Sequence, residues 1–123
     1  METKIKDFTD LEAWKESHSV VLEIYKITST FPKDERFGLV DQMRRAAVSV
    51  TSNIAEGFSR YSKNDKAHFY TIATGSITEL QNQLIISKDL KYITAQQHKI
   101  LHEKLVKAHK LSNGLIKSVR SFA

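Results

Sequence analysis

The chain has 123 residues, of which 41% are hydrophobic and 27% are charged, with one Pro and four Gly. This length suits one ordinary domain with a hydrophobic core, and the composition is too apolar for a disordered chain. The lack of Cys excludes disulfides, thiolate nucleophiles and Cys-based zinc or iron–sulfur sites. The sequence shows no apolar run of a secretory signal or a membrane span, so we expect a cytoplasmic protein that does not contact membranes.

The net charge is +5, and the position of the excess is informative. Residues 1–31 hold four basic and six acidic residues, whereas residues 94–123 hold six basic residues and one acidic residue. The last segment therefore carries a surplus equal to that of the whole chain.

The first expected helix follows Phe8. Thr9 and Glu12 have the spacing of a capping box, in which each satisfies a backbone N–H of the other. The helix should end near Phe31, because Pro32 disfavours a helical residue before it. Steps of three and four predict the inward face: Leu11, Trp14, His18, Val21, Tyr25 and Thr28.

A second apolar stripe on this helix consists of Val20, Ile24, Ile27 and Phe31, extended by Ala13. It lies roughly opposite the predicted inward face. Either the helix is buried on all sides within its own bundle, or the stripe contacts another subunit. We favour the subunit contact, because each helix of a bundle keeps one side toward solvent.

The second expected helix begins between Glu35 and Phe37 and runs to about Tyr61. Its predicted buried positions follow helical spacing: Val40, Met43, Ala47, Val50, Ile54 and Phe58. Ser62 and Asp65 form a weaker capping pair for a third helix. The inward face of that third helix is predicted as Tyr70, Ala73, Ile77, Leu80 and Leu84.

Thr94 with Gln97 opens the fourth helix. Its predicted buried face holds Leu101, Leu105, Ala108, Leu115, Val119 and Phe122. No segment alternates with the period of a strand. Short connections require each helix to return beside the previous one, so we predict an all-α, antiparallel up-down-up-down four-helix bundle. It should form a single domain over residues 1–123, with residues 1–8 as a short N-terminal extension.

The run QMRRAAVSVTSNIAEGFSR, residues 42–60, places a polar ribbon opposite the buried face of the second helix: Gln42, Arg45, Ser49, Asn53, Glu56 and Arg60. The third helix has a comparable outer strip of polar or small residues: Gly75, Ser76, Glu79 and Gln83. The ribbon is a solvated surface, a ligand or phosphate site, or a subunit contact. We favour the contact, because a solvated face usually carries more Lys and Glu and less Ser and Asn. With the apolar stripe, the predicted interface residues are Val20, Ile24, Ile27, Arg45, Ser49, Asn53, Glu56, Arg60 and Glu79.

The same run, with FP and ERFGL before it and IATGSITELQ after it, resembles the small bacterial four-helix bundle proteins encoded in intervening sequences of 23S ribosomal RNA genes. LEAWKESHSVVLEIYKIT also fits the first helix of that family, so the resemblance extends from about Phe8 to Val119. The family is similar in fold to the accessory variability determinant of diversity-generating retroelements. The resemblance implies a homopentamer with a basic surface that suits nucleic acid or a nucleic-acid-handling partner, and it supplies no catalytic residues.

Residues for catalysis or metal binding are not evident. The chain lacks a P-loop and a nucleotide-binding glycine fingerprint. His98 and His102 share a helical face, but two histidines fall short of the usual three or four metal ligands. His18 is expected to be a hydrogen-bonded core residue. We therefore predict a non-enzymatic protein without metal or cofactor.

The fourth helix supplies the candidate nucleic-acid contact: Lys99, Lys107, Lys110, Lys117 and Arg120. Such a basic stripe is typical of binding to a phosphate backbone, although it also occurs on solvated helix faces. We predict binding of RNA rather than DNA. The alternative is an oligomeric scaffold that docks an acidic or nucleic-acid-processing protein, and a phosphodiesterase is the third possibility.

Overall fold

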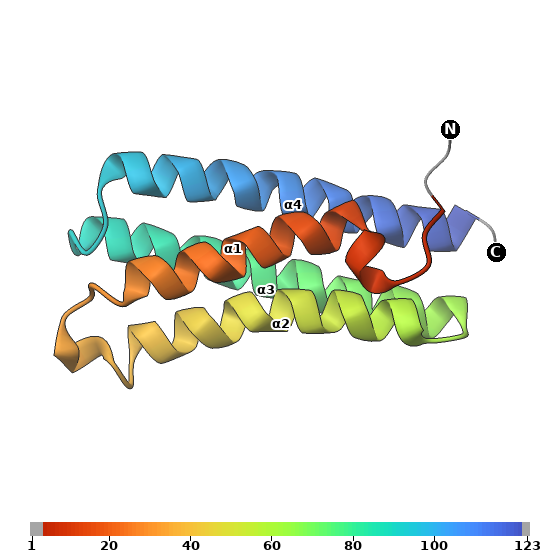
Figure 1. Ribbon diagram of the computed structural model, residues 1–123, viewed down its shortest axis with the longest axis horizontal. Helices are drawn as coiled ribbons and strands as arrows, with labels where there is room; N and C mark the ends of the chain where they lie inside the picture. Colours follow the sequence, from red (N-terminus) through yellow and green to blue (C-terminus); the bar gives the residue numbers. More distant parts are fainter. Residues whose placement is uncertain (1–3, 122–123) are drawn as a thin grey trace.

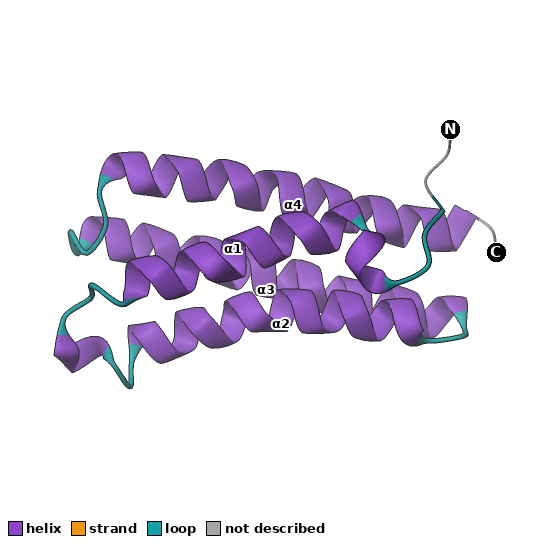
Figure 2. Cartoon of the chain, in the orientation of Figure 1, coloured by secondary structure: helices purple, strands orange, loops and turns teal. Residues whose placement is uncertain are grey.

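The computed structural model describes residues 4–121. In chain order it contains η1 (Phe8–Asp10), α1 (Glu12–Thr28), η2 (Lys33–Glu35), α2 (Leu39–Ser59), α3 (Lys63–Asp89) and α4 (Ala95–Ser121), where η marks a short 3-10 helix. The described residues include no strand (Figure 2). The predicted all-α class and four-helix bundle are therefore confirmed.

The four α-helices run side by side, and each reverses the direction of the one before it (Figure 1). α2 packs against α1 and α3, and α4 packs against α3 and α1, which closes the bundle. The turn between α2 and α3 lies at the same end as the start of α1 and the end of α4 (Figure 1). We call this the α2–α3 end and the opposite one the η2 end.

The buried faces predicted for the second, third and fourth helices are confirmed. In α3 all five predicted residues are buried. In α2 and α4, Phe58, Leu115 and Val119 are partly exposed but pack against the core, and the other described residues of the predicted faces are buried. Phe122 lies outside the described residues. These faces are regular because one apolar stripe on each helix meets the centre of the bundle.

The core face of α1 differs from the prediction. Val20 and Ile24 are 1% and 0% exposed, and Ile27 is also buried, all within this chain. The prediction that these three residues contact another subunit is therefore wrong. Short or β-branched side chains occupy the centre, with Ala13 and Ser17 completing the buried face.

Most of the stripe predicted to face inward lies on the flank of α1. Trp14 and His18 are half-buried and stack on each other, with ring centroids 4.5 Å apart and planes 11° apart. Tyr25 lies beside α2 and is 44% exposed. Amphipathic rings suit such an edge position, because the apolar body packs while the polar tip reaches water. His18 is accordingly an edge residue and not the hydrogen-bonded core residue that we expected.

The start of α1 also differs. Asp7 Oδ1 accepts a hydrogen bond from the Thr9 backbone N–H, and Asp10 Oδ2 accepts one from the Asp7 N–H. The capping box thus belongs to η1 and uses Asp7 and Asp10, so the predicted Thr9 and Glu12 pair is wrong. The N–H groups of Lys6 and Asp7, which donate to the Asp10 carboxyl, lower its pKa.

α2 begins later than predicted, at Leu39, and ends at Ser59. Glu35 lies before α2, and its Oε1 accepts a hydrogen bond from the Leu39 N–H at 3.5 Å. Its Oε2 accepts a hydrogen bond from the Tyr92 hydroxyl at 2.9 Å, across the bundle, which raises the pKa of Tyr92. Glu35 therefore links η2 to the segment before α4.

The caps of the last two helices are confirmed. The Asp65 N–H donates to Ser62 Oγ at 3.0 Å. Thr94 and Gln97 form a reciprocal box, in which each backbone N–H donates to the side chain of the other. Both caps satisfy N–H groups that the first turn of a helix leaves without partners.

α2 and α3 approach closely at Gly57. A Cβ built on Gly57 would lie 2.7 Å and 2.9 Å from two ring carbons of Tyr70, which is buried in the core. Only a residue without a side chain fits there. The glycine of the NIAEG segment is therefore explained by helix packing.

Candidate nucleic-acid interface and neighbouring faces

α4 presents its basic side chains on the side away from the core. Leu101, Leu105, Ala108 and Ser112 are buried, whereas the predicted contact residues are all exposed: Lys99, Lys107, Lys110, Lys117 and Arg120. The stretch from residue 104 to 120 has five basic and no acidic residues. An outward face with this charge attracts polyanions.

Two lysines of α4 are turned toward α1. Lys107 Nζ lies 3.6 Å from Glu16 Oε2, and Lys104 Nζ donates a hydrogen bond to Ser19 Oγ at 2.6 Å. Part of the charge of α4 is thus balanced within the chain. No ion pair joins Lys99, Lys110, Lys117 or Arg120 to an acidic residue among residues 4–121. These four side chains remain available to phosphates.

His98 and His102 lie at the beginning of α4, with ring centroids 5.7 Å apart. Partial burial lowers the pKa of His98, and the nearby Lys88 and His102 add to this effect. Within residues 4–121 no group of three or more His, Asp or Glu side chains is arranged to hold a metal ion. The pair is therefore a stacked contact between two imidazoles near the η2 end.

The polar ribbon of α2 meets α3 directly. The hydroxyls of Ser49 and Ser76 are 2.8 Å apart, and Asn53 Nδ2 donates to the Ser49 carbonyl at 2.8 Å. Sequence periodicity places the α2 ribbon and the α3 strip on separate helices, and the structure brings them together at these serines. Their short side chains let the two helices pack closely.

The charged members of the ribbon have partners on their own helices. Arg45 Nε is 3.1 Å from Asp41 Oδ2, and Arg60 Nε is 3.1 Å from Glu56 Oε2. Both ion pairs are largely exposed to solvent, and such pairs typically contribute well under 1 kcal/mol each. The arginines of the ribbon are therefore not a ready-made phosphate site.

Glu79 lies on the neighbouring strip of α3. Its Oε1 accepts a hydrogen bond from Gln83 Nε2 at 3.3 Å, one helical turn away. The carboxylate is thus also engaged within its own helix.

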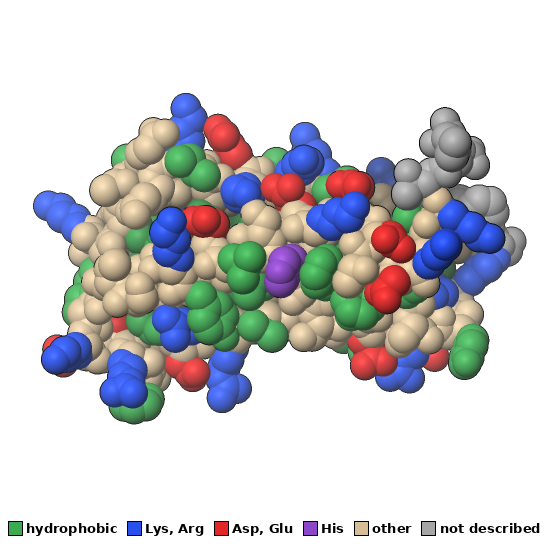
Figure 3. Space-filling view, viewed as in Figure 1, with side chains coloured by type: hydrophobic (Ala, Val, Ile, Leu, Met, Phe, Trp, Pro, Cys, Tyr) green, Lys and Arg blue, Asp and Glu red, His purple; other side chains and the backbone are tan. Residues whose placement is uncertain are grey.

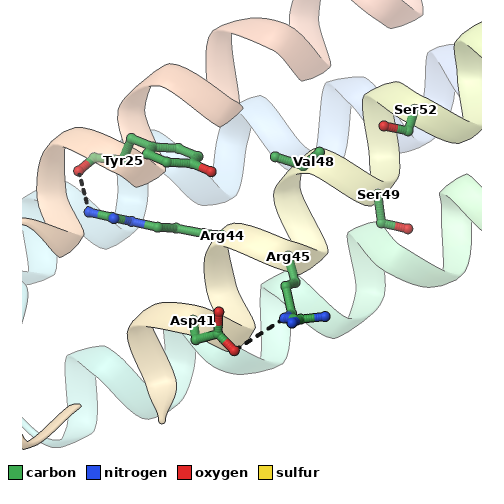
Figure 4. Close-up of a pocket in the computed structure, with 7 residues that line it drawn as sticks. All are labelled: Tyr25, Asp41, Arg44, Arg45, Val48, Ser49 and Ser52. Atoms are coloured by element: carbon green, nitrogen blue, oxygen red, sulfur yellow. Dashed lines mark hydrogen bonds and ion pairs between the residues drawn. The ribbon is translucent and has the colours of Figure 1, made fainter. Parts of the chain in front are cut away.

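A groove between α1 and α2 was missed from the sequence. It has a volume of about 680 Å³ and is lined by Tyr25, Asp41, Arg44, Arg45, Val48, Ser49 and Ser52 (Figure 4). The Arg44 guanidinium lies over the Tyr25 ring, 4.6 Å from its centroid, and its Nε donates to Thr28 Oγ1. Because Tyr25 and Thr28 were predicted to face the core, the helical wheels did not indicate a groove between α1 and α2.

Hydrophobic side chains gather along this α1 and α2 face, with charged side chains around them (Figure 3). Leu22 and Val48 are 58% and 39% exposed. An exposed apolar patch of this kind marks a contact surface more often than isolated apolar residues do.

No helix among residues 4–121 is long and apolar enough to cross a membrane.

Comparison with known proteins agrees with this architecture. A crystal structure of a protein of unknown function from the S23 ribosomal protein family of Bacteroides thetaiotaomicron superposes with a TM-score of 0.79. The two chains are 22% identical, and the match covers 85% of this chain and 95% of the other. At that identity the likeness supports the fold.

A search of curated proteins finds no match. Residues 9–114 match the profile of the family described as 23S rRNA-intervening sequence protein. The matched residues include all of α1, α2 and α3, the ribbon and most of the basic helix. The chain therefore belongs to the 23S rRNA-intervening sequence protein family.

Proposed function

We propose that this protein binds RNA through the outer side of α4 and catalyses no reaction on it. The main support for the proposal is the stretch of residues 104–120, which has five basic and no acidic residues. Lys110, Lys117 and Arg120 in this stretch are exposed to solvent. Lysine side chains bind phosphates as point charges, and each contact releases counterions from the nucleic acid. The description of the family supports RNA over DNA as the ligand.

The test is a titration of the protein against a structured RNA, a DNA duplex of equal length and an acidic protein, each at several salt concentrations. We expect RNA to bind with a dissociation constant in the micromolar range at low salt and to weaken steadily as salt rises. If RNA does not bind even at low salt, the proposal is wrong.

We propose further that the protein assembles into a homo-oligomer. Exposed apolar side chains occur on α1 and α2, with Leu22, Tyr25 and Val48, and on the outer side of α3, with Ile72 and Ile86. The remaining candidate contacts are Arg45, Ser49, Asn53, Glu56, Arg60 and Glu79, which form or adjoin the α2 and α3 face. The resemblance to the family suggests a pentamer, which would repeat the basic helix and raise avidity for RNA.

Light scattering measures the assembly directly. We expect a mass that is a multiple of the 14.1 kDa chain, five chains in the pentamer. A single 14.1 kDa species at micromolar concentration would contradict the proposal.

A protein scaffold is the second candidate function. The groove between α1 and α2, with its apolar and arginine lining, is the observation that favours it. In that case the acidic protein in the titration would bind and RNA would not.

A further inference from the structure

The turn between α2 and α3 exposes an aromatic ring completely. Tyr61 has a relative exposure of 102%, the highest among the exposed large hydrophobic residues of the described chain. Its neighbours Arg60 and Ser62 both have extended backbone angles, with ψ of 154° and 147°. Ser62 is engaged in the cap of α3, so the chain crosses the end of the bundle and directs Tyr61 away from it. Nothing in the fold requires an aromatic residue at this position.

The guanidinium of Arg60, the residue before Tyr61, is held in place by two contacts. It lies 4.7 Å from the centroid of the Phe69 ring, and its Nε contacts Glu56 Oε2 at 3.1 Å. The Arg60 side chain is nevertheless 44% exposed. One side of the guanidinium therefore rests on Phe69, and the group remains accessible from outside. Arginine planes and aromatic rings are the two surfaces on which proteins stack unpaired bases.

The charge around this turn is positive. Residues 56–66 include Arg60, Lys63 and Lys66 against Glu56 and Asp65, a surplus of one positive charge. Lys66 is used within the fold, since its Nζ donates to the Phe58 carbonyl at 2.7 Å. Lys63 has no ion pair with an acidic residue of the described chain and is exposed. Lys117 and Arg120, near the end of α4, lie at the same end of the bundle (Figure 1).

The opposite end offers an internal comparison. Phe37 is also highly exposed, at 86%, and follows Arg36. Its surroundings are different, because residues 33–41 contain three acids and two bases. A polyanion would therefore be attracted more to the turn around Tyr61 than to the segment around Phe37. Phe37 is therefore a matched control for Tyr61.

We propose that the α2–α3 turn stacks unpaired bases of single-stranded RNA on the Tyr61 ring and the Arg60 guanidinium. Lys63 binds a neighbouring phosphate, and the lysines of α4 bind phosphates further along the strand. This inference rests on the proposed function and deepens it, because it names the form of RNA that is recognised. A base paired within a duplex has no free face, so duplex RNA would use the lysines and leave Tyr61 unoccupied.

The experiment measures binding of a fluorescently labelled, unstructured 12-nucleotide RNA and of a 12-base-pair RNA duplex. Removing one aromatic ring on which a base stacks weakens single-strand binding by about fivefold to about 150-fold. We expect Tyr61→Ala to reduce affinity within this range for the single strand and to change it little for the duplex. Tyr61→Trp should retain binding, because stacking needs a ring and not a hydroxyl. Phe37→Ala should bind as the unmodified protein does.

The salt dependence separates stacking from charge. Tyr61→Ala should leave the slope of log affinity against log salt unchanged, whereas Lys63→Ala should reduce it by about 0.7, the value for one phosphate of a single strand.

Equal loss of affinity in Tyr61→Ala and Phe37→Ala, or no loss in Tyr61→Ala while RNA still binds, overturns this inference and leaves the proposed function standing. A change of oligomer mass in Tyr61→Ala with unchanged affinity also overturns it and assigns the ring to a subunit interface. Failure of every RNA to bind the unmodified protein rejects both proposals.

Discussion

Replacing Ile24 with aspartate is expected to unfold the bundle. Ile24 is fully buried in the core of its own chain, so the variant loses apolar burial and places a carboxyl among apolar side chains. Truncation of a buried isoleucine alone costs about 2–5 kcal/mol, and burial of an unsatisfied polar group adds about 1–3 kcal/mol. This sum approaches the whole free energy of unfolding of an ordinary domain. Far-UV circular dichroism during urea titration measures the loss.

Leu22→Asp is the control on the same helix. Leu22 is 58% exposed in the single chain, so its replacement should change the free energy of unfolding of the separated chain by about 0.5 kcal/mol or less. Any effect on the proposed oligomer would appear in light scattering and not in the helicity. If Ile24→Asp kept its helicity and its unfolding midpoint but separated an oligomer into single chains, the assignment of Ile24 to the core would be wrong. The prediction from the sequence that Ile24 contacts another subunit would then be correct.

Gly57→Ala is expected to destabilise the protein by about 1–3 kcal/mol, as overpacking of a core usually does. The added Cβ would lie 2.7 Å from a Tyr70 ring carbon and 3.2 Å from the Lys66 carbonyl oxygen. A buried aromatic ring and a backbone oxygen cannot move without separating α2 from α3. Alanine normally stabilises a helix interior relative to glycine by about 1 kcal/mol. Helix propensity alone would therefore predict that Gly57→Ala stabilises the protein, the opposite of the effect expected here.

Two other glycines serve as controls. A Cβ at Gly75 or Gly114 meets nothing within 4 Å, so alanine there should raise the free energy of unfolding by up to about 1 kcal/mol. Combining Gly57→Ala with Tyr70→Leu should remove most of the added cost, which a double-mutant cycle in urea would report as coupling. A stabilised Gly57→Ala would show that α2 and α3 do not meet closely at this point.

The sequence was sufficient for the class of fold because three helices each have a single apolar stripe. Met43, Ile77 and Leu105 follow such stripes, and the caps of α3 and α4 use local spacing that can be read directly. α1 was different. It has two apolar stripes, and a helical wheel cannot tell which one meets the bundle centre when aromatic residues fill the other.

The site could be predicted only in part for a similar reason. Periodicity placed Lys110 and Lys117 outside, but it could not show that Lys107 meets Glu16 of α1. Such interactions depend on how two helices distant in the chain lie together. The exposure of Tyr61 was also invisible, because a turn residue has no periodic neighbours that fix its direction. The resemblance to the family supplied the expected number of subunits, which local patterns alone do not give.

The most direct test of RNA binding by α4 is the salt slope of a double variant, Lys110→Ala with Lys117→Ala. Lys26→Ala with Lys33→Ala removes the same charge from exposed positions near the η2 end and is the control. We expect the α4 variant to reduce the slope of log affinity against log salt by about 0.9 for each duplex phosphate that it no longer binds, or about 0.7 for a single strand. The control should keep a slope close to that of the unmodified protein. Equal slopes for the two double variants would contradict the assignment of α4 as the RNA-binding surface.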